Sequence, residues 1–356
     1  MGYKLNEKLA ELIPYEPISG DYEIRLDANE SCYNLSDEIA EKIADEMKRI
    51  DYNRYPDPYA RNAVKAFSDF YEVDETLVTA GNGSDELISI ISSCFLEKGD
   101  TVVTLAPDFT MYAFYGSLYE LNVEIFNKSD DLMVDVDALI EFCKVKNAKA
   151  LIFSNPCNPT SLGISKIDVK KLIESLDCLV ILDEAYMDFW TESLLSDIQK
   201  YDNCIILKTC SKAVGLAAIR LGFAVAGKTI TTALRAAKSP YNTDSISQMI
   251  GEVVFKDKDY VNARITEIVN NTQGLYKEML NLQEEFSLFE KIYETKTNFI
   301  FIKTCYEDKI FNELLKNSIA TRKFKGFLRI TSCSVDENKK LISVMKNILA
   351  DIKTGG

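Results

Sequence analysis

Between residues 76 and 227 the chain alternates short apolar runs, each of a strand's length, with segments in which apolar residues recur at helical spacing. The runs lie at 76–80, 101–106, 122–126, 148–154, 178–183, 203–209 and 222–226. Most are apolar throughout rather than at every second position, which is typical of strands buried on both faces of a sheet. The pattern predicts an α/β fold with a mainly parallel central sheet flanked by helices.

The last third of the chain has a different order of elements. A helical run at 245–285 is followed by a β-rich run at 297–304, a helix at 308–317, a β-rich stretch at 322–331 and a final helix at 335–352. We therefore predict a large domain over residues 31–255 and a smaller α+β domain over residues 256–356. Residues 1–30 are predicted to form an extended N-terminal arm.

Composition narrows the possible functions. A formal net charge of −14 argues against non-specific binding to nucleic acid or to an anionic membrane surface. The nine cysteines form no C-x-x-C pair, so we expect core residues rather than disulfides or a metal site. We see no signal peptide and no membrane-spanning stretch, and expect a cytoplasmic protein. The chain has no histidine, which leaves acid–base chemistry to lysine, tyrosine, cysteine or carboxylates.

Polar motifs follow several predicted strands at their carboxyl ends, where ligands bind in such sheets. In TAGNGSDELI, at 79–88, two glycines turn the chain and Ser84 is placed to cap a helix that opens with Asp85. The free N–H groups of a helix start can hold a phosphate. An ordinary strand–turn–helix junction has the same pattern, and the third glycine of the dinucleotide fingerprint is absent.

Two further motifs add hydrogen-bonding and charged groups. SNPCNPTSLG, at 154–163, forms either a rigid loop or one that presents Asn158 to a ligand. LVILDEAYMDF, at 179–189, places Asp183 and Tyr186 at the end of an apolar strand. Since a buried unpaired carboxylate is costly, we expect a cationic partner or hydrogen bonds there.

The fourth motif is KTCSKAVGLAAIR, at 208–220. Thr209 and Ser211 lie three positions and one position before Lys212, and Arg220 lies eight positions after it. Most lysines lie on the surface, but this one follows an apolar strand. Together the four motifs fit a cofactor with a phosphate, a basic ring nitrogen, a phenolic oxygen and an aldehyde.

In order and spacing these motifs resemble those of the fold-type I pyridoxal phosphate (PLP) enzymes of class I/II, and among them the histidinol-phosphate aminotransferase family. The matching segments are LDANES (26–31), NRYPDP (53–58), GNGSDELI (81–88), NPCNPT (155–160), DEAYMDF (183–189), SKAVGLAAIRLG (211–222), PYN (240–242), TNF (297–299) and LRIT (328–331). The resemblance implies a homodimeric aminotransferase whose large domain binds PLP and whose arm packs with the small domain and the dimer partner.

The resemblance also implies roles for individual residues. Lys212 forms the Schiff base with PLP and carries the proton, and Asp183 pairs with the ring nitrogen. Asn158 and Tyr186 hydrogen-bond the phenolic oxygen, and Phe109 stacks on the ring. The phosphate is held by Gly83, Ser84, Asp85, Thr209, Ser211 and Arg220, with Tyr55 reaching it from the neighbouring subunit.

For the substrate, Arg329 is similar to the arginine with which these enzymes clamp an anionic group, and Tyr15 to an arm tyrosine that covers the substrate phosphate. Arg322 either assists or belongs to a solvated basic hairpin. The implied reaction is a ping-pong transamination of L-histidinol phosphate with 2-oxoglutarate, in histidine biosynthesis. Ser161 and Ala218 stand where the family usually has glycine. An aromatic or broad-specificity aminotransferase, a threonine-phosphate decarboxylase and a non-catalytic cofactor sensor remain alternatives.

Overall fold

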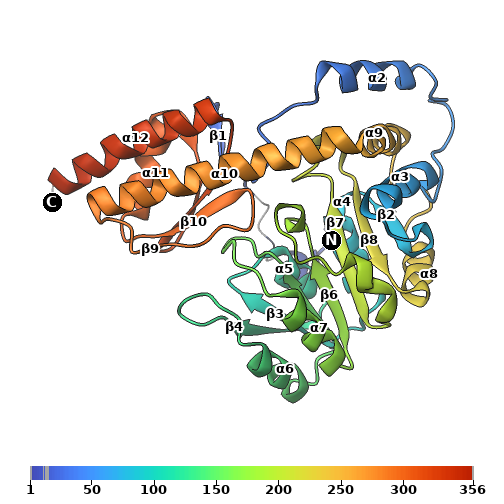
Figure 1. Ribbon diagram of the computed structural model, residues 1–356. Helices are drawn as coiled ribbons and strands as arrows, with labels where there is room; N and C mark the ends of the chain where they lie inside the picture. The colour runs from blue at the N-terminus through green and yellow to red at the C-terminus, as the bar shows by residue number, and fades with distance from the viewer. Residues whose placement is uncertain (1, 11, 13–15, 355–356) are drawn as a thin grey trace.

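A computed structural model describes residues 2–10, 12 and 16–354 of the protein (Figure 1). In this described part of the chain, a seven-stranded sheet has the strand order β2-β8-β7-β6-β5-β3-β4. The strands are β2 (Val78–Gly81), β3 (Thr101–Ala106), β4 (Asn122–Asn127), β5 (Ala150–Ser154), β6 (Leu179–Asp183), β7 (Cys204–Thr209) and β8 (Gly222–Ala226). The strands from β4 to β7 run parallel, and β8 is antiparallel to both of its neighbours. The predicted mainly parallel sheet is confirmed, and every predicted run lies within two residues of its strand.

Helices cover both faces of this sheet (Figure 1). One face packs against α3 (Arg61–Tyr71), α6 (Val136–Val145), α7 (Lys166–Ser175) and α9 (Ser245–Lys256), and the other against α4 (Gly83–Cys94), α5 (Met111–Leu118) and α8 (Lys228–Ala237). The helix α2 (Asp37–Met47) packs on α9. Successive residues of one strand alternate between the two cores: Val180 and Leu182 of β6 join the first and Ile181 joins the second. This two-sided burial explains why most of the strands are apolar throughout.

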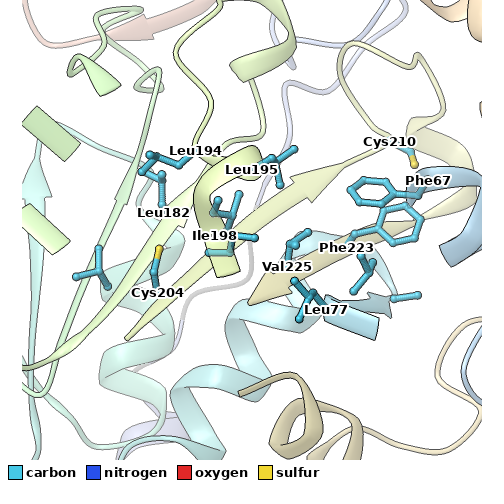
Figure 2. Packing of buried hydrophobic residues seen from close by; sticks show 14 of the residues in the cluster. Phe67, Leu77, Leu182, Leu194, Leu195, Ile198, Cys204, Cys210, Phe223 and Val225 are labelled. Carbon is cyan, nitrogen blue, oxygen red and sulfur yellow. The ribbon is translucent and has the colours of Figure 1, made fainter. Parts of the chain in front are cut away.

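The larger of these cores is rich in aromatic rings. Phe67 of α3 stacks on Phe223 of β8 (Figure 2). Their ring centroids lie 4.1 Å apart. Short 3-10 helices join the main elements at η1 (Glu75–Leu77), η2 (Met187–Phe189), η3 (Leu195–Lys200) and η4 (Ala217–Ile219). Of these, η2 follows β6 and η4 follows β7, so the chain leaves the carboxyl end of each strand in a compact turn.

The C-terminal part has a core of its own. It contains an antiparallel sheet of order β12-β13-β10-β9 together with α11 and α12. The bounds are β9 (Lys291–Ile292), β10 (Phe299–Lys303), α11 (Glu307–Lys316), β12 (Arg322–Phe324), β13 (Phe327–Thr331) and α12 (Val335–Thr354). Near the N-terminus, after α1 (Glu7–Ala10), β1 (Ile24–Arg25) pairs parallel with β11 (Ile319–Ala320). Ile24 and Leu26 are buried in the C-terminal core, so the N-terminal segment packs against the C-terminal part of the chain.

A long helix, α10 (Lys258–Phe286), connects the two parts (Figure 1). Val261 near its start belongs to the core of the large sheet, whereas Leu275 near its end belongs to the C-terminal core. The predicted helical run at 245–285 is wrong as a single helix. Asp257 separates α9 from α10 and caps the second helix, because its carboxylate accepts a hydrogen bond from the Tyr260 N–H (3.2 Å).

Within the described ranges, none of the helices combines the length and the apolar character that crossing a lipid bilayer requires.

Candidate active site

The start of α4 forms one wall of the site. The helix begins at Gly83, and the N–H of its N-cap residue, Asn82, donates to Glu86 Oε2 (2.6 Å). Ser84 therefore lies in the first helical turn and is not the cap that the sequence analysis predicts, because the turn at Gly83 (φ +81°) starts the helix earlier. The first N–H groups of an α-helix have no partner inside the helix, so this end suits an anion.

Arg220, which lies two residues before β8, reaches the same helix start. Gly83 has a left-handed backbone, which favours glycine, and the missing side chain leaves room for Arg220, whose Nη2 would lie 2.8 Å from a Cβ at this position. Arg220 Nη1 donates to Ser211 Oγ (3.3 Å), and Nη2 lies 3.6 Å from Asp85 Oδ2. The structure thus brings together all the phosphate residues predicted within one chain: Gly83, Ser84, Asp85, Thr209, Ser211 and Arg220. Their amide, hydroxyl and guanidinium donors match a phosphate dianion.

Asp183 ends β6 and is 4% exposed. Its Oδ2 accepts a hydrogen bond from the Tyr112 hydroxyl (2.7 Å) and its Oδ1 one from the Ala185 N–H (3.0 Å). Burial raises the pKa of Asp183 to about 6, against the opposing effect of these two hydrogen bonds. No ion pair of Asp183 with a cation is present among the described residues, so the carboxylate is suited to a cationic group supplied by a ligand.

Lys212 and Tyr186 lie at the same edge of the sheet as Asp183, because β6 and β7 are parallel neighbours. Lys212 Nζ donates to the Ala28 carbonyl (2.9 Å) and lies 6.0 Å from the centroid of the Tyr186 ring. Tyr186 is buried, and its hydroxyl oxygen accepts a hydrogen bond from Asn29 Nδ2 (3.0 Å). An amine, a phenol and a buried carboxylate therefore converge at this edge.

Asn158, in the loop after β5, is held by the C-terminal part of the chain. Arg329 Nη1 of β13 donates to Asn158 Oδ1, and Nη2 donates to the Asp27 carbonyl. With its oxygen engaged by the arginine, the amide nitrogen of Asn158 is left as a donor for a ligand. Phe109 is half-buried and packs edge-on against Tyr112, with ring centroids 5.5 Å apart.

A buried ion pair, which the sequence analysis missed, anchors the loops of Phe109 and Asn158. Lys128 Nζ lies 3.8 Å from Asp108 Oδ2, and both side chains are almost fully buried. Asp108 accepts hydrogen bonds from the Phe109 N–H (2.8 Å) and the Ser154 hydroxyl, and Ser154 Oγ accepts one from the Asn158 N–H (3.1 Å). Burial raises the pKa of Asp108, and Lys128 opposes that rise.

The predicted substrate residues are brought together only in part. Arg322 lies directly opposite Arg329 in the β12–β13 pair, which places both side chains on one face of the hairpin. Tyr15 lies outside the described residues. Tyr55 is 80% exposed, and its ring stacks on Tyr241, with centroids 4.5 Å apart, rather than on the phosphate residues of its own chain.

Of the two positions where glycine is usual in the family, Ser161 has a clear structural account. It takes the left-handed conformation that glycine adopts readily (φ +63°). Its hydroxyl donates to Thr295 Oγ1 (3.1 Å) and accepts from the Lys296 N–H (3.0 Å), so the loop is fixed to the segment before β10. Nothing in the structure explains Ala218.

Outside this site, Cys32, Cys333 and Glu337 bring three possible metal-ligand atoms within 4.8 Å of one another. The Glu337 carboxylate accepts hydrogen bonds from the Ser334 N–H (3.2 Å) and hydroxyl, which accounts for its position without an ion.

Comparison with known proteins agrees with this geometry. The model of the family "Aminotransferase class I and II" matches residues 22–345. A histidinol-phosphate aminotransferase of Clostridium novyi (strain NT) is 41% identical over 345 residues, which cover 96% of each chain. The chain belongs to the histidinol-phosphate aminotransferase family.

Solved structures show the same fold at low sequence identity. A histidinol-phosphate aminotransferase from Sinorhizobium meliloti, in complex with pyridoxal-5′-phosphate, is 20% identical and covers 99% of both chains with a TM-score of 0.87. An L-threonine-O-3-phosphate decarboxylase from Porphyromonas gingivalis is 18% identical, with a TM-score of 0.77 over 92% of this chain and 99% of its own. Fold alone therefore does not separate transamination from decarboxylation, whereas the identity to the Clostridium novyi protein favours the aminotransferase branch.

Proposed function

We propose that the protein is a PLP-dependent transaminase that exchanges an amino group between L-histidinol phosphate and 2-oxoglutarate by a ping-pong mechanism, in the histidine biosynthesis of the cytoplasm. The observation that carries the proposal is the arrangement around Lys212. Its amine lies at the same sheet edge as buried Asp183, whose described contacts include no cation, and as the phosphate-binding group around Arg220. A phosphorylated aldehyde with a basic ring nitrogen fits these three features together.

PLP, when bound, supplies an aldehyde for the lysine amine and a ring that accepts electron density from the substrate's α-carbon. Lys212 would hold the cofactor through its amine between turnovers. During turnover the same amine would act as the base that takes the proton from the substrate α-carbon and delivers it to C4′ of the cofactor. The chain has no histidine, so an amine takes the role of the general base.

The residues around Lys212 orient the PLP ring and determine the protonation of its nitrogen. Asp183 would pair with the ring nitrogen and keep it protonated, because a buried carboxylate gains most from an adjacent cation. Asn158 and Tyr186 donate to the phenolic oxygen, and Phe109 covers one ring face. The phosphate is held by the start of α4, Thr209, Ser211 and Arg220 in the large domain (31–255).

The substrate phosphate, or the distal carboxylate of 2-oxoglutarate, is bound by the small domain (256–356). Arg329 is buried between the rings of Phe299 and Phe324, 5.5 and 5.9 Å from their centroids, and opposite Arg322 in the hairpin. Two guanidinium groups on one face can bind a dianion with paired hydrogen bonds. Tyr15 of the arm (1–30) closes the site across a homodimer.

The homodimer completes the phosphate site. Two exposed aromatic side chains lie beside the start of α4: Tyr55 (80% exposed) stacks on Tyr241 (48% exposed), and Asn242, the next residue, donates to Glu86 Oε2 of α4 (2.6 Å). Large exposed aromatic groups of this kind mark interfaces. The partner's Tyr55 donates to the phosphate, which makes each site the product of two chains.

A half-reaction screen tests the proposal. PLP-loaded protein is mixed with one amino donor at a time, without a keto acid, and loss of the PLP absorbance band is followed. We expect histidinol phosphate to react faster than phenylalanine or tyrosine. The reverse order would assign an aromatic aminotransferase, and release of carbon dioxide from threonine phosphate would assign a decarboxylase. The wild-type protein should show an absorbance band that borohydride bleaches, and Lys212→Ala must abolish this band.

A further inference from the structure

The segment LDANES (26–31) contains a buried asparagine that the cofactor contacts above do not use. Asn29 is 1% exposed and has a left-handed backbone (φ +56°). Every polar group of the residue is bonded. Its N–H donates to Thr331 Oγ1 (3.2 Å), and its carbonyl accepts from Asn298 Nδ2 (3.0 Å). The single hydroxyl hydrogen of Thr331 is shared between Asn29 Oδ1 (3.1 Å) and the Leu26 carbonyl (2.9 Å). The fourth group, Nδ2, donates to the Tyr186 hydroxyl oxygen (3.0 Å).

This last bond fixes the direction in which Tyr186 can donate. An amide NH₂ is a donor only, so the Tyr186 oxygen is the acceptor in its bond with Asn29. The single hydroxyl hydrogen of Tyr186 is thereby left for another acceptor. A phenol that accepts one hydrogen bond is also polarised into a stronger donor of the next. Asn29 thus makes Tyr186 a directed donor toward the middle of the site.

The contact also joins Tyr186 to the C-terminal part of the chain. Thr331, which holds the Asn29 side chain, lies two residues after Arg329 on β13. Asn298, which holds the Asn29 carbonyl, directly precedes β10. The orientation of the Tyr186 hydroxyl is therefore set by the strand that carries the predicted substrate arginine.

We propose that Asn29 is a positioning residue that directs the Tyr186 hydroxyl hydrogen to the phenolic oxygen of PLP. The inference rests on the proposed function, and it goes further by assigning to Asn29 the tuning of the bound cofactor. Donation by Tyr186 withdraws electron density from the phenolic oxygen. That oxygen then stabilises less strongly the proton on the nitrogen that joins Lys212 to the cofactor. Loss of Asn29 should raise the pH at which this proton leaves.

The experiment is a pH titration of the absorbance of PLP-loaded protein without substrate. Asn29→Gly removes the side chain and keeps a residue that tolerates the left-handed backbone. We expect the midpoint of the colour change to move upward by about half a pH unit, a roughly threefold gain in proton affinity. Tyr186→Phe should move it further in the same direction.

A double-mutant cycle separates positioning from a general structural effect. In the Tyr186→Phe background, Asn29→Gly should produce no additional shift, because its action passes through the missing hydroxyl. A matched control is Asn271→Ala, which removes another asparagine-to-tyrosine bond, from Asn271 Nδ2 to the Tyr33 hydroxyl (2.6 Å). This control should leave the midpoint unchanged.

Each outcome has one meaning. Additive shifts in the double mutant, or an Asn29→Gly titration identical to wild type, overturn the inference while leaving the proposed function intact. A wild-type protein that takes up no PLP defeats the proposed function itself. The dissociation constant of PLP, measured by equilibrium dialysis, gives a second readout, with an increase of about threefold to tenfold expected for Asn29→Gly.

Discussion

Tyr112 donates a 2.7 Å hydrogen bond to Asp183 Oδ2, across 71 residues of sequence. The tyrosine comes from the first turn of α5 and the carboxylate from the end of β6. Both side chains are buried, and burial together with the Asp183 charge raises the pKa of Tyr112 well above its ordinary value. The tyrosine therefore stays protonated and serves as a fixed donor that supports the ionised form of Asp183.

The first prediction is that the cofactor-free protein loses stability as the pH rises from about 4 to about 6. The folded-state pKa of Asp183 is raised to about 6, so the folded protein binds this proton more tightly than the unfolded chain does. The stabilisation is fully present below the unfolded pKa and is lost as the pH passes the folded one. The expected decrease in the free energy of unfolding is up to about 3 kcal/mol. Urea unfolding of the cofactor-free protein at several pH values measures it.

Asp108 and Glu184 are also buried carboxyl groups with raised pKa values, and they contribute to the pH dependence as well. The Asp183→Asn variant is therefore the control that isolates the contribution of Asp183. The wild-type minus Asp183→Asn difference should fall across the stated window. Tyr112→Phe should extend the fall to higher pH, since the Tyr112 bond lowers the pKa of Asp183. A difference that is flat between pH 4 and 7 would contradict the assignment. PLP should reduce the fall by pairing the carboxylate.

The Tyr112–Asp183 bond also shows where sequence reasoning stops. Asp183 was found because a carboxylate at the end of an apolar strand is unusual, and Lys212 because it follows the neighbouring strand. Continuous apolar runs likewise predict the order of strands and helices. Tyr112 stands three positions after Phe109 in an apolar helix, where an aromatic residue reads as ordinary core. Its partner depends on how α5 packs on the sheet, which a local pattern does not contain.

Other misses have the same physical origin. Lys128 and Asp108 pair only because β4 and the loop after β3 are brought together in the parallel sheet. Asn29 acts through a left-handed backbone and contacts more than 150 residues away in sequence. The sequence predicts Ser84 as the helix cap because serine favours that position. The glycine turn and the Glu86 carboxylate supply the cap instead.

The second prediction concerns a buried cation next to the site. Lys208 Nζ lies 2.7 Å from Asp188 Oδ1, and the two side chains are 3% and 8% exposed. Glu184 is also fully buried nearby, and Lys208 counteracts the burial that raises its pKa. Lys208→Met leaves these carboxylates without their cation, so we expect a loss of about 3–5 kcal/mol in the free energy of unfolding.

Lys65→Met is the matched comparison for Lys208→Met. Lys65 pairs with Asp69 at 3.0 Å, but the side chains are 63% and 58% exposed. Solvent screens this pair, so its loss should cost no more than about 1 kcal/mol. Equal effects of the two substitutions in urea denaturation would refute the importance of the buried pair.

The third prediction is an order of stability at Ser161. Ser161→Ala removes the bonds to Thr295 and Lys296 and keeps a side chain in a left-handed backbone, at a cost of about 2 kcal/mol. Ser161→Gly removes the same bonds but relieves the backbone, so it should cost roughly 1 kcal/mol less. Thermal unfolding of both variants checks the order. The opposite ranking would mean that Ser161 is not strained.

The last prediction tests whether Tyr55 works across a homodimer. Tyr55→Ala should weaken PLP binding about tenfold or more with little effect on chain stability, since the side chain is 80% exposed.

Lys212→Ala protein has no activity of its own. When the two variants are mixed, unfolded and refolded together, half of the dimers are hybrids. In each hybrid, the site that retains Lys212 receives an intact Tyr55 from the Lys212→Ala chain. At a PLP concentration that saturates only wild-type sites, activity should recover to about a quarter of wild type. If Tyr55 served the site of its own chain, the hybrid would contain no complete site and the mixture would stay inactive.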